Sequence, residues 1–263
     1  MLITVGSIKS GASTTTALAL GATWPGGATV VVVEADPSGG DVAAVFGLER
    51  EPDLVSLSAA ARTRHDVQLL TEHAQALPGG LRVVAAPPGA EQATGALGVL
   101  ARDTAPLWAA AARAEDLVVI VDVGRLDPGS PALALVAAAD AAVLVARPSL
   151  VEAHSLGKRL DGLIGAAHAS DTRLHLVLHG EGYPAEQVSE SLAFPVTAHL
   201  PHDVKAAAIL SGAGRGELRR TALAGAAYRL GKSLLAERSE HTAAEAAVTD
   251  AETMQVLDLE EVA

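Results

Sequence analysis

The chain has 263 residues, of which 49% are hydrophobic and 19% charged, and its formal net charge is −12 at pH 7. This balance is typical of a globular protein with a sizeable core and excludes a chain that is disordered throughout. The lack of cysteine excludes disulfides and thiolate metal sites, and the acidic charge disfavours a nucleic-acid footprint over the whole surface.

Seven short apolar runs alternate with segments of helical spacing. The runs are continuous, as expected of strands buried on both faces. We expect strands at 2–5, 29–33, 81–86, 117–121, 142–146, 174–178 and 196–200. We expect helices at 14–21, 40–46, 67–75, 90–114, 130–138, 151–167, 184–192, 204–211 and 216–236. The alternation predicts an α/β fold: a doubly wound, mostly parallel sheet with helices on both faces, whose ligands bind at the carboxyl ends of the strands.

The last part of the chain differs in charge from the rest. Residues 237–263 hold eight acidic residues against one arginine, which predicts an acidic, flexible tail after a single domain of residues 1–236. A short partner-binding piece near its end is the less favoured alternative. No signal-peptide pattern and no uninterrupted apolar stretch of membrane-spanning length is found, so we expect a cytoplasmic protein with no membrane insertion.

The stretch GSIKSGASTTTALAL, residues 6–20, follows the first expected strand. It has the position of a phosphate-binding loop, which turns backbone amides and a lysine toward phosphate while a hydroxyl holds Mg²⁺. Against G-x-x-x-x-G-K-[ST], however, Ile8 and Ser13 take the glycine positions and Thr14 takes the lysine position. Only Thr15 matches, so the motif alone is weak.

The loop resembles that of the ParA/MinD family of deviant-Walker ATPases, which reads K-G-G-x-G-K-T-T. The matching residues are Lys9, Ser10, Gly11, Ala12, Ser13, Thr14, Thr15 and Thr16. VVVEADPSGGDVAAVFGL is similar to the family's D-x-D-P segment, LVVIVDVGRL looks like its Walker B strand, and FPVTAHLPHDVKAAAIL contains a Leu-Pro-x-Asp that borders adenine in the family. The resemblance covers residues 2–235 and implies a P-loop NTPase fold.

The resemblance implies a role for each matching residue. ATP or ADP with Mg²⁺ would be the cofactors, and nucleotide contacts would come from Lys9 to Thr16 and from Pro201 and Asp203. Lys9 would reach across a homodimer to the partner's nucleotide, and Asp36 would orient the attacking water. Thr15, Glu34 and Asp122 would hold the metal. The alternative for these acidic residues is turn and capping chemistry at strand ends, since Asp-Pro-Ser-Gly is a good turn in any protein.

Departures from the family pattern bear on activity. The neutral hydroxyl of Thr14 cannot replace a lysine that stabilises phosphate charge, so ATPase activity should be weak or absent. Ser10 and Ser13 place side chains where the family has glycine, and His179 lies near the place of an adenine-binding asparagine. The histidines on or just beyond two neighbouring strands are better explained as polar strand-end residues than as a metal site: His175, His179, His199 and His202.

The continuation GGDVAAVFGL is closest to the TadZ/CpaE-like branch. The leading hypothesis is a protein with a degenerate ATPase site that acts as a dimerising scaffold or spatial-positioning factor through a protein partner. One alternative is an active, slow ATPase in which Lys9 supplies the missing charge and nucleotide-dependent dimers drive partitioning or positioning. Another is a DNA-associated segregation factor, disfavoured by the net charge, that uses a basic late helix: Arg215, Arg219, Arg220, Arg229 and Lys232.

Overall fold

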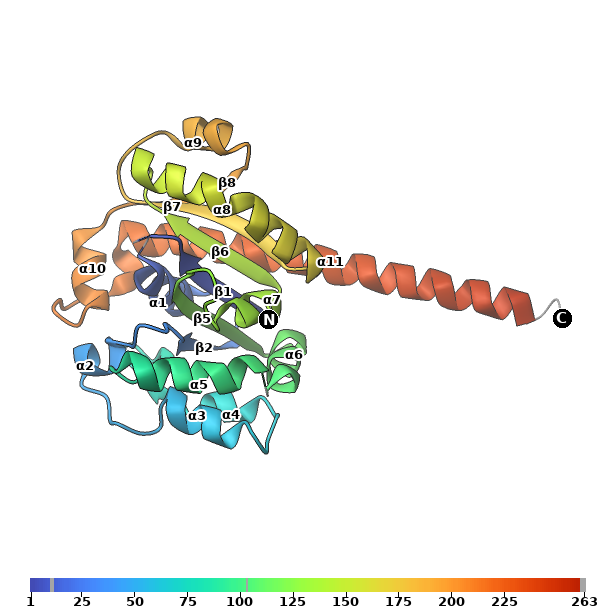
Figure 1. Cartoon of the computed structure of the whole chain (residues 1–263), viewed down its shortest axis with the longest axis horizontal. Coiled ribbons are helices and arrows are strands. Elements are labelled where there is room, and N and C mark those ends of the chain that lie inside the picture. The colour runs from blue at the N-terminus through green and yellow to red at the C-terminus, as the bar shows by residue number, and fades with distance from the viewer. Residues whose placement is uncertain (10–11, 103, 261–263) are drawn as a thin grey trace.

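The computed structural model in Figure 1 describes residues 1–9, 12–102 and 104–260, with side chains as far as Ala243. The strands are β1 (Leu2–Ser7), β2 (Thr29–Glu34), β3 (Gln75–Ala76), β4 (Arg82–Val84), β5 (Leu117–Arg125), β6 (Ala141–Ala146), β7 (Arg173–His179) and β8 (Val196–Leu200). They form one sheet in the order β3-β4-β2-β5-β1-β6-β7-β8, parallel except for β3 against β4. Each of the seven predicted strands is present, and the predicted doubly wound α/β fold is confirmed.

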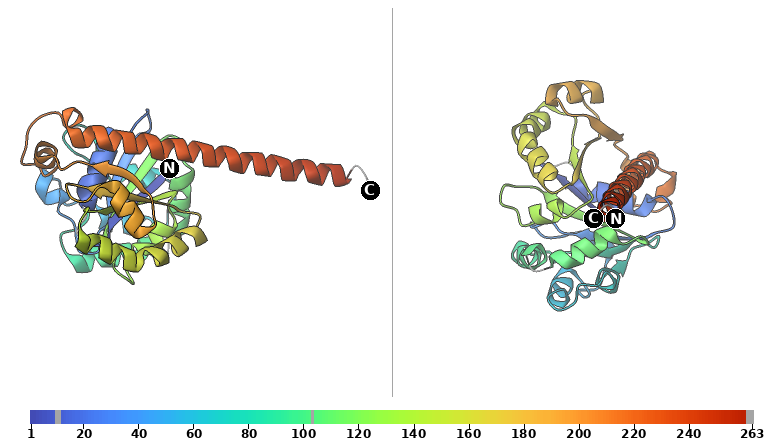
Figure 2. Two further views of the ribbon diagram at one scale, coloured as in Figure 1. Left: turned by 90° about the horizontal axis from the view of Figure 1, so that it is seen from above. Right: turned by 90° about the vertical axis from the view of Figure 1, so that its right-hand side faces the viewer.

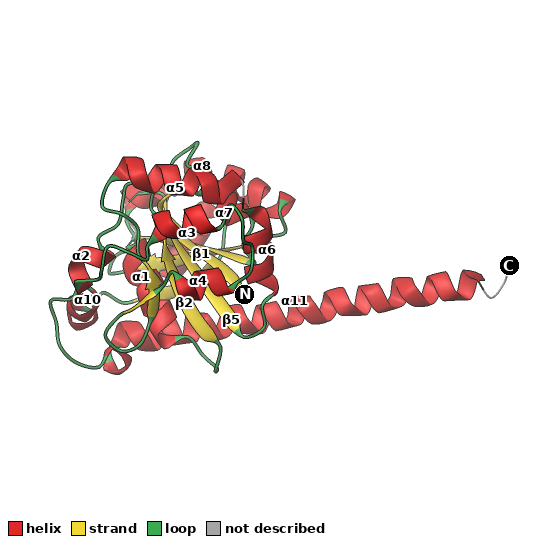
Figure 3. Ribbon diagram, turned by 90° about the horizontal axis from the view of Figure 1, so that it is seen from below, coloured by secondary structure: helices red, strands yellow, loops and turns green. Residues whose placement is uncertain are grey.

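Helices cover both faces of this sheet. They are α1 (Ser13–Thr23), α2 (Val42–Phe46), α3 (Leu54–Ala60), α4 (Gln68–Glu72), α5 (Ala90–Arg102), α6 (Ala105–Arg113), α7 (Leu133–Ala137), α8 (Leu150–Ala169), α9 (Ala185–Leu192), α10 (Val204–Leu210), the short 3-10 helix η1 (Leu218–Arg220) and α11 (Ala222–Glu260). Figure 3 shows α5, α7 and α8 on one side of the sheet and α10 and α11 on the other. Among the described helices, none is both long and apolar enough to cross a membrane.

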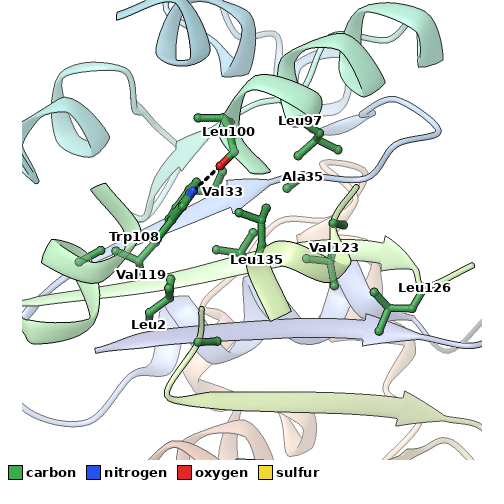
Figure 4. Close-up of a cluster of buried hydrophobic side chains, with 14 of the residues drawn as sticks. Leu2, Val33, Ala35, Leu97, Leu100, Trp108, Val119, Val123, Leu126 and Leu135 are labelled. Carbon is green, nitrogen blue, oxygen red and sulfur yellow. Dashed lines mark hydrogen bonds between the residues drawn. The ribbon is translucent and has the colours of Figure 1, made fainter. Parts of the chain in front are cut away.

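The core has two parts, one on each face of the sheet. In the cluster under α3 to α8, Trp108 is buried and its indole Nε1 donates to the Leu100 carbonyl over 2.8 Å, as Figure 4 shows. The cluster on the other face is mostly aliphatic, with Trp24 as its buried aromatic residue, and joins α1 to the first turns of α11. There a Cβ on Gly21 would lie 2.7 Å from a Val32 methyl, so the missing side chain lets α1 pack close to β2. Small residues thus set the helix-to-sheet distance, as the composition suggests.

The helix boundaries show where local signals override periodicity. The single helix expected at 90–114 is wrong: α5 ends at Arg102 and α6 begins at Ala105, with Pro106 in the first turn, where the missing amide is not needed. Helix α3 was not expected from apolar spacing, although Asp53 and Ser56 form a reciprocal capping box at its start, with both bonds 2.8 Å long.

The last helix is longer than its expected range of 216–236. Helix α11 continues to Glu260, and Figures 1 and 2 show its second half projecting well beyond the sheet. Its departure from the body is held by Glu237, whose Oε2 lies 3.4 Å from His175 Nε2, and by Arg238, whose Nη2 donates to the Ala112 carbonyl over 2.7 Å. The backbone of 237–260 is therefore helical in this structure, and a division of the chain at residue 236 stays a prediction.

Candidate functional site

The topology gathers the ends of β1, β2 and β5 at one edge of the sheet. β1 lies between β5 and β6, and β2 pairs with β5 so that Glu34 faces Asp122. Because these strands are parallel, the residues that follow their carboxyl ends meet at the same rim. The loop between β1 and α1, the Glu34 to Asp36 segment and the Asp122 segment are there, as the sequence predicts.

The loop enters α1 through a left-handed residue. Ala12 has φ 57° and ψ 41°, a conformation that costs an alanine roughly 1–2 kcal/mol, and its backbone carbonyl accepts from the Thr16 amide over 3.0 Å. Ser10 and Gly11, two of the predicted phosphate-cradle residues, lie outside the described residues. Lys9 is exposed and Thr15 is half-buried. The nucleotide contacts predicted for this loop stay predictions.

The side chain at the lysine position faces Asp122. The Thr14 hydroxyl Oγ1 donates to Asp122 Oδ2 over 2.5 Å, a short hydrogen bond that joins residues 108 positions apart. The other carboxylate oxygen, Oδ1, accepts from the Gly124 amide over 3.1 Å. The Ser13 hydroxyl also hydrogen-bonds the Asp122 carboxylate. The two positions at which the loop departs most from the family pattern therefore hold the Walker-B-like carboxylate.

Asp122 is the most deeply buried of the site's acidic residues, with 1% of its surface exposed. Burial raises its pKa to about 6, the hydrogen bonds from Thr14, Gly124 and Ser13 oppose that rise, and the nearby charge of Asp36 adds to it. A carboxylate in this place would be costly without its donors. The hydroxyls of Ser13 and Thr14 supply them.

Asp36 lies beside Asp122 across the strand ends. Its Oδ1 accepts from the Ser38 amide over 2.7 Å, so it also closes the turn that follows it. Gly124 has φ +58°, and a Cβ built on it would overlap the Asp36 carboxyl group. The glycine thus allows both its own left-handed conformation and the close approach of Asp36. The water-orienting role of Asp36 stays a prediction.

Glu34 is buried and bound to backbone. Its Oε1 accepts from the amides of Asp41 and Val42 over 3.0 and 3.2 Å, and its Oε2 accepts from the amide of Ala86 over 2.9 Å. Burial raises its pKa to about 7, although these amides oppose the rise. The side chain ties β2 to the segment after β4 and to the start of α2. Its predicted place beside a metal stays a prediction, since all the bonds that the structure gives it are internal.

The two residues predicted to border adenine lie farther along the rim, after β8. Asp203 Oδ1 caps α10 by accepting from the Ala206 amide over 2.9 Å, and Oδ2 accepts from the Leu223 amide at the start of α11 over 3.2 Å. The Ala206 amide and further backbone amides lower the pKa of this carboxyl. Pro201 is half-buried just beyond the strand. Asp203 therefore joins two helices, and nucleotide contact by either residue stays a prediction.

The histidines and basic residues are more dispersed. Burial and the neighbouring charges of His202, Arg147 and His199 lower the pKa of His179, so these side chains gather at the ends of β6 to β8. Within the described part of the chain, no three histidine or acidic side chains are placed to hold a metal ion. The basic residues expected on one helix are divided between η1, α11 and the segment before them, and Arg220 pairs with Glu217 over 2.9 Å.

The carboxylates that a magnesium ion would use already accept hydrogen bonds from the chain's own donors. Magnesium prefers oxygen ligands in an octahedral shell and usually takes one or two carboxylates with several waters. Here Asp122 is buried beneath two hydroxyls and an amide, Glu34 serves three amides, and Asp36 holds its own turn. A cation that entered would first have to displace these internal donors.

Sequence reasoning missed an apolar surface on the same rim. Leu150 and Val204 are 71% exposed and Val151 is 65% exposed, and Tyr183 is also exposed. Leu150 and Val151 begin the helix after β6, Tyr183 follows β7, and Val204 begins the helix after β8. The Tyr183 amide donates to the carbonyl of Pro148 over 2.9 Å, which holds the first two of these loops together. The signal was present in the sequence as apolar residues four positions after the strand ends: Leu150 after Ala146, Tyr183 after His179 and Val204 after Leu200.

Comparison with known proteins identifies the fold of this chain but finds no relative of similar sequence. No protein-family model matches the sequence, and no curated protein is similar to it. A ParA family ATPase from Chlorobium tepidum TLS superposes with a TM-score of 0.67 at 16% identity, over 88% of this chain and 96% of that one. The septum site-determining protein MinD from Pyrococcus horikoshii OT3, complexed with Mg-ADP, gives 0.63 at 16% identity over 89% and 96%.

A third similar structure is that of a synthase rather than of a ParA or MinD protein. Cobyrinic acid a,c-diamide synthase from Mycobacterium smegmatis, with a bound ATP analogue and magnesium, gives a TM-score of 0.62 at 17% identity over 89% of this chain and 93% of that one. Proteins of unlike function therefore share this architecture, and likeness at this identity speaks for fold alone. The chain has the P-loop NTPase fold of the ParA/MinD ATPases.

Proposed function

We propose that this chain is a ParA/MinD-like protein whose ATPase site has degenerated and which acts as a dimerising scaffold or spatial-positioning factor through a protein partner, close to the TadZ/CpaE-like branch. The observation that carries the proposal is the bond from Thr14 to Asp122. A lysine at position 14 would bring a positive charge to the phosphates, whereas the threonine hydroxyl is neutral and faces the carboxylate.

The loss of this charge bears on catalysis more than on fold. Phosphoryl transfer depends on positioning and on cations that stabilise the charge of the transferring group. The remaining cation of the loop, Lys9, is exposed, and the metal-side carboxylates are held by internal donors. These features support a protein that keeps the architecture and has little or no turnover.

The apolar rim of Leu150, Val151, Tyr183 and Val204 supports a role in assembly. Side chains of this kind are costly to leave in water, and a group of them at one edge of the sheet favours a surface for a partner. They lie at the carboxyl ends of β6 to β8, on the same edge of the sheet as the Thr14–Asp122 pair. We assign this rim to a second copy of the chain, in a symmetric dimer that presents other surfaces to the protein partner.

Calorimetric titration tests the loss of nucleotide function. ATP and ADP with MgCl₂ should give no binding heat with the purified protein, and a sensitive phosphate-release assay should show no turnover. Lys9→Ala is the matched variant, since it removes the cation that an active site would need. Binding with turnover that Lys9→Ala abolishes would contradict the proposal and favour the slow ATPase.

The dimer is tested separately by sedimentation. The wild-type protein should sediment as a dimer, and Leu150→Ser with Val204→Ser should shift it to the monomer while the circular dichroism spectrum stays the same. A protein that is monomeric at high concentration would exclude the dimer without bearing on the nucleotide site.

A further inference from the structure

We propose that Asp122 works as a metal-independent latch: the hydroxyls of Ser13 and Thr14 and the Gly124 amide hold it where a hydrated cation would otherwise contact it, so that the first turn of α1 is fixed without magnesium or nucleotide. The inference deepens the proposed function, on which it rests, because it says how the degenerate site is regulated. With this latch, the first turn of α1 has the same position with or without magnesium and nucleotide.

Both oxygens of the Asp122 carboxylate accept hydrogen bonds from this chain. Thr14 donates to Oδ2 over 2.5 Å and the Gly124 amide donates to Oδ1 over 3.1 Å, so each oxygen has a donor from this chain. Ser13 adds a second hydroxyl to the same group. Bonds from donors to an ionised oxygen are about twice as strong as those between neutral groups.

The bonded carboxylate is also buried. Asp122 is 1% exposed and Ser13 is 9% exposed, so the bonded group is shut off from bulk water. To contact Asp122, a cation would have to move the Thr14 hydroxyl off Oδ2 or the Gly124 amide off Oδ1. Such a movement would leave a buried carboxylate without its donors until the cation arrived, which is the costly state that the hydroxyls prevent.

The neighbouring carboxylates also have internal partners. Glu34 accepts from three backbone amides, and Asp36 accepts from the amide of Ser38. Each of the three acidic side chains at this edge therefore accepts at least one hydrogen bond from this chain. The latch follows from the whole arrangement rather than from one short bond.

The loop joins strand β1 to helix α1, and α1 packs against α11 and β2. The bonds from Ser13 and Thr14 to Asp122 hold the start of α1 at the edge of the sheet that also carries Leu150 and Val204. If that edge is the dimer surface, the dimer should form equally well with EDTA, with MgCl₂ and with Mg·ATP. Nucleotide would then not act as a switch.

The test compares three substitutions in the first turn of α1. Thr14→Val keeps the shape of the side chain and removes the hydroxyl, and Thr14→Ser keeps the hydroxyl and removes the methyl group. Thr15→Val is the control, since it removes the next hydroxyl along the helix, for which the structure gives no contact with Asp122. Thermal unfolding is measured for each variant in EDTA and in millimolar MgCl₂.

The latch predicts that Tm of the wild-type protein is the same with and without Mg²⁺. Thr14→Val should lower Tm by roughly 3–12 °C, as expected for loss of a hydrogen bond to a charged group in a domain of this size. Thr14→Ser should recover most of that loss, and Thr15→Val should show little of it. Added Mg²⁺ should raise Tm of Thr14→Val, whose Asp122 has lost a donor, and leave the others unchanged.

Two results would overturn the latch. One is a Thr14→Val protein that melts with the wild type, which would show that the hydroxyl does not hold Asp122 and would leave the proposed loss of ATPase function untouched. The other is a wild-type protein that Mg²⁺ stabilises as strongly as it does Thr14→Val. Heat from Mg·ATP in the wild-type titration would instead contradict the proposed function, so the two failures are distinguishable.

Discussion

Glu34 offers a sharp prediction, because burial and hydrogen bonding act on it in opposite directions. The side chain is 3% exposed, and burial raises its pKa from 4.5 to about 7 against the pull of three amides. Between these values the folded state holds a proton that the unfolded state has released. Linkage then makes the folded state more stable as the pH falls from about 8 to about 5.

The difference between the folded and unfolded pKa of Glu34 corresponds to about 3 kcal/mol of unfolding free energy. Asp122 acts in the same direction, so the comparison needs a variant that removes only the Glu34 contribution. Glu34→Gln does so, because its amide does not titrate while its oxygen can still accept from Asp41 and Val42. Its NH₂ group would face the Ala86 amide, donor against donor, at a cost of about 1–3 kcal/mol.

The assay is urea unfolding at pH 5, 6, 7 and 8, followed by the fluorescence of the two buried tryptophans, Trp24 and Trp108. The advantage of the wild type over Glu34→Gln should be largest at pH 5 and should shrink as the pH rises through about 7. Parallel curves over this range would refute the reasoning. They would show that the three amides hold Glu34 ionised against the effect of burial.

Two further substitutions test the packing. Gly124→Ala puts a Cβ into the Asp36 carboxyl group at φ +58° and should lower the free energy of unfolding in urea by at least about 2 kcal/mol. Gly129→Ala is the control: at φ +82° with open space around it, it should cost only the left-handed strain of about 1 kcal/mol. Equal costs would contradict the overlap with Asp36. Trp108→Phe removes the hydrogen bond to the Leu100 carbonyl and leaves a void, so it should lower the free energy of unfolding by about 2–4 kcal/mol in the same assay. A loss under about 1 kcal/mol would show that the core closes around the smaller ring.

The sequence predicted the sheet well because strands buried on both faces leave continuous apolar runs, such as 29–33 and 117–121. It predicted helix ends less well, because capping acts through single residues. Pro106 divides the helix expected at 90–114. The capping box of Asp53 and Ser56 begins a helix that apolar spacing does not show. The strand β3 has two residues, too few for any periodicity.

The site was predicted as a set of residues and not as a set of contacts. Placing strand ends at one rim brings Asp36 and Asp122 together, as the structure confirms. The bond from Thr14 to Asp122 spans 108 positions, and the bond from Ala86 to Glu34 spans 52, so neither can be read from local spacing. In these contacts Asp122 and Glu34, which were predicted to lie beside a metal, accept hydrogen bonds from the chain's own hydroxyls and amides.

The central claim is that Thr14 leaves the site without phosphoryl chemistry. Its most direct test is phosphate release from ATP with MgCl₂, measured side by side for the wild-type protein and Thr14→Lys. We predict no release by the wild type and a measurable gain, in binding heat and in release, when the lysine is restored. Release by the wild type that is lost in Lys9→Ala and in Asp36→Ala would contradict the account.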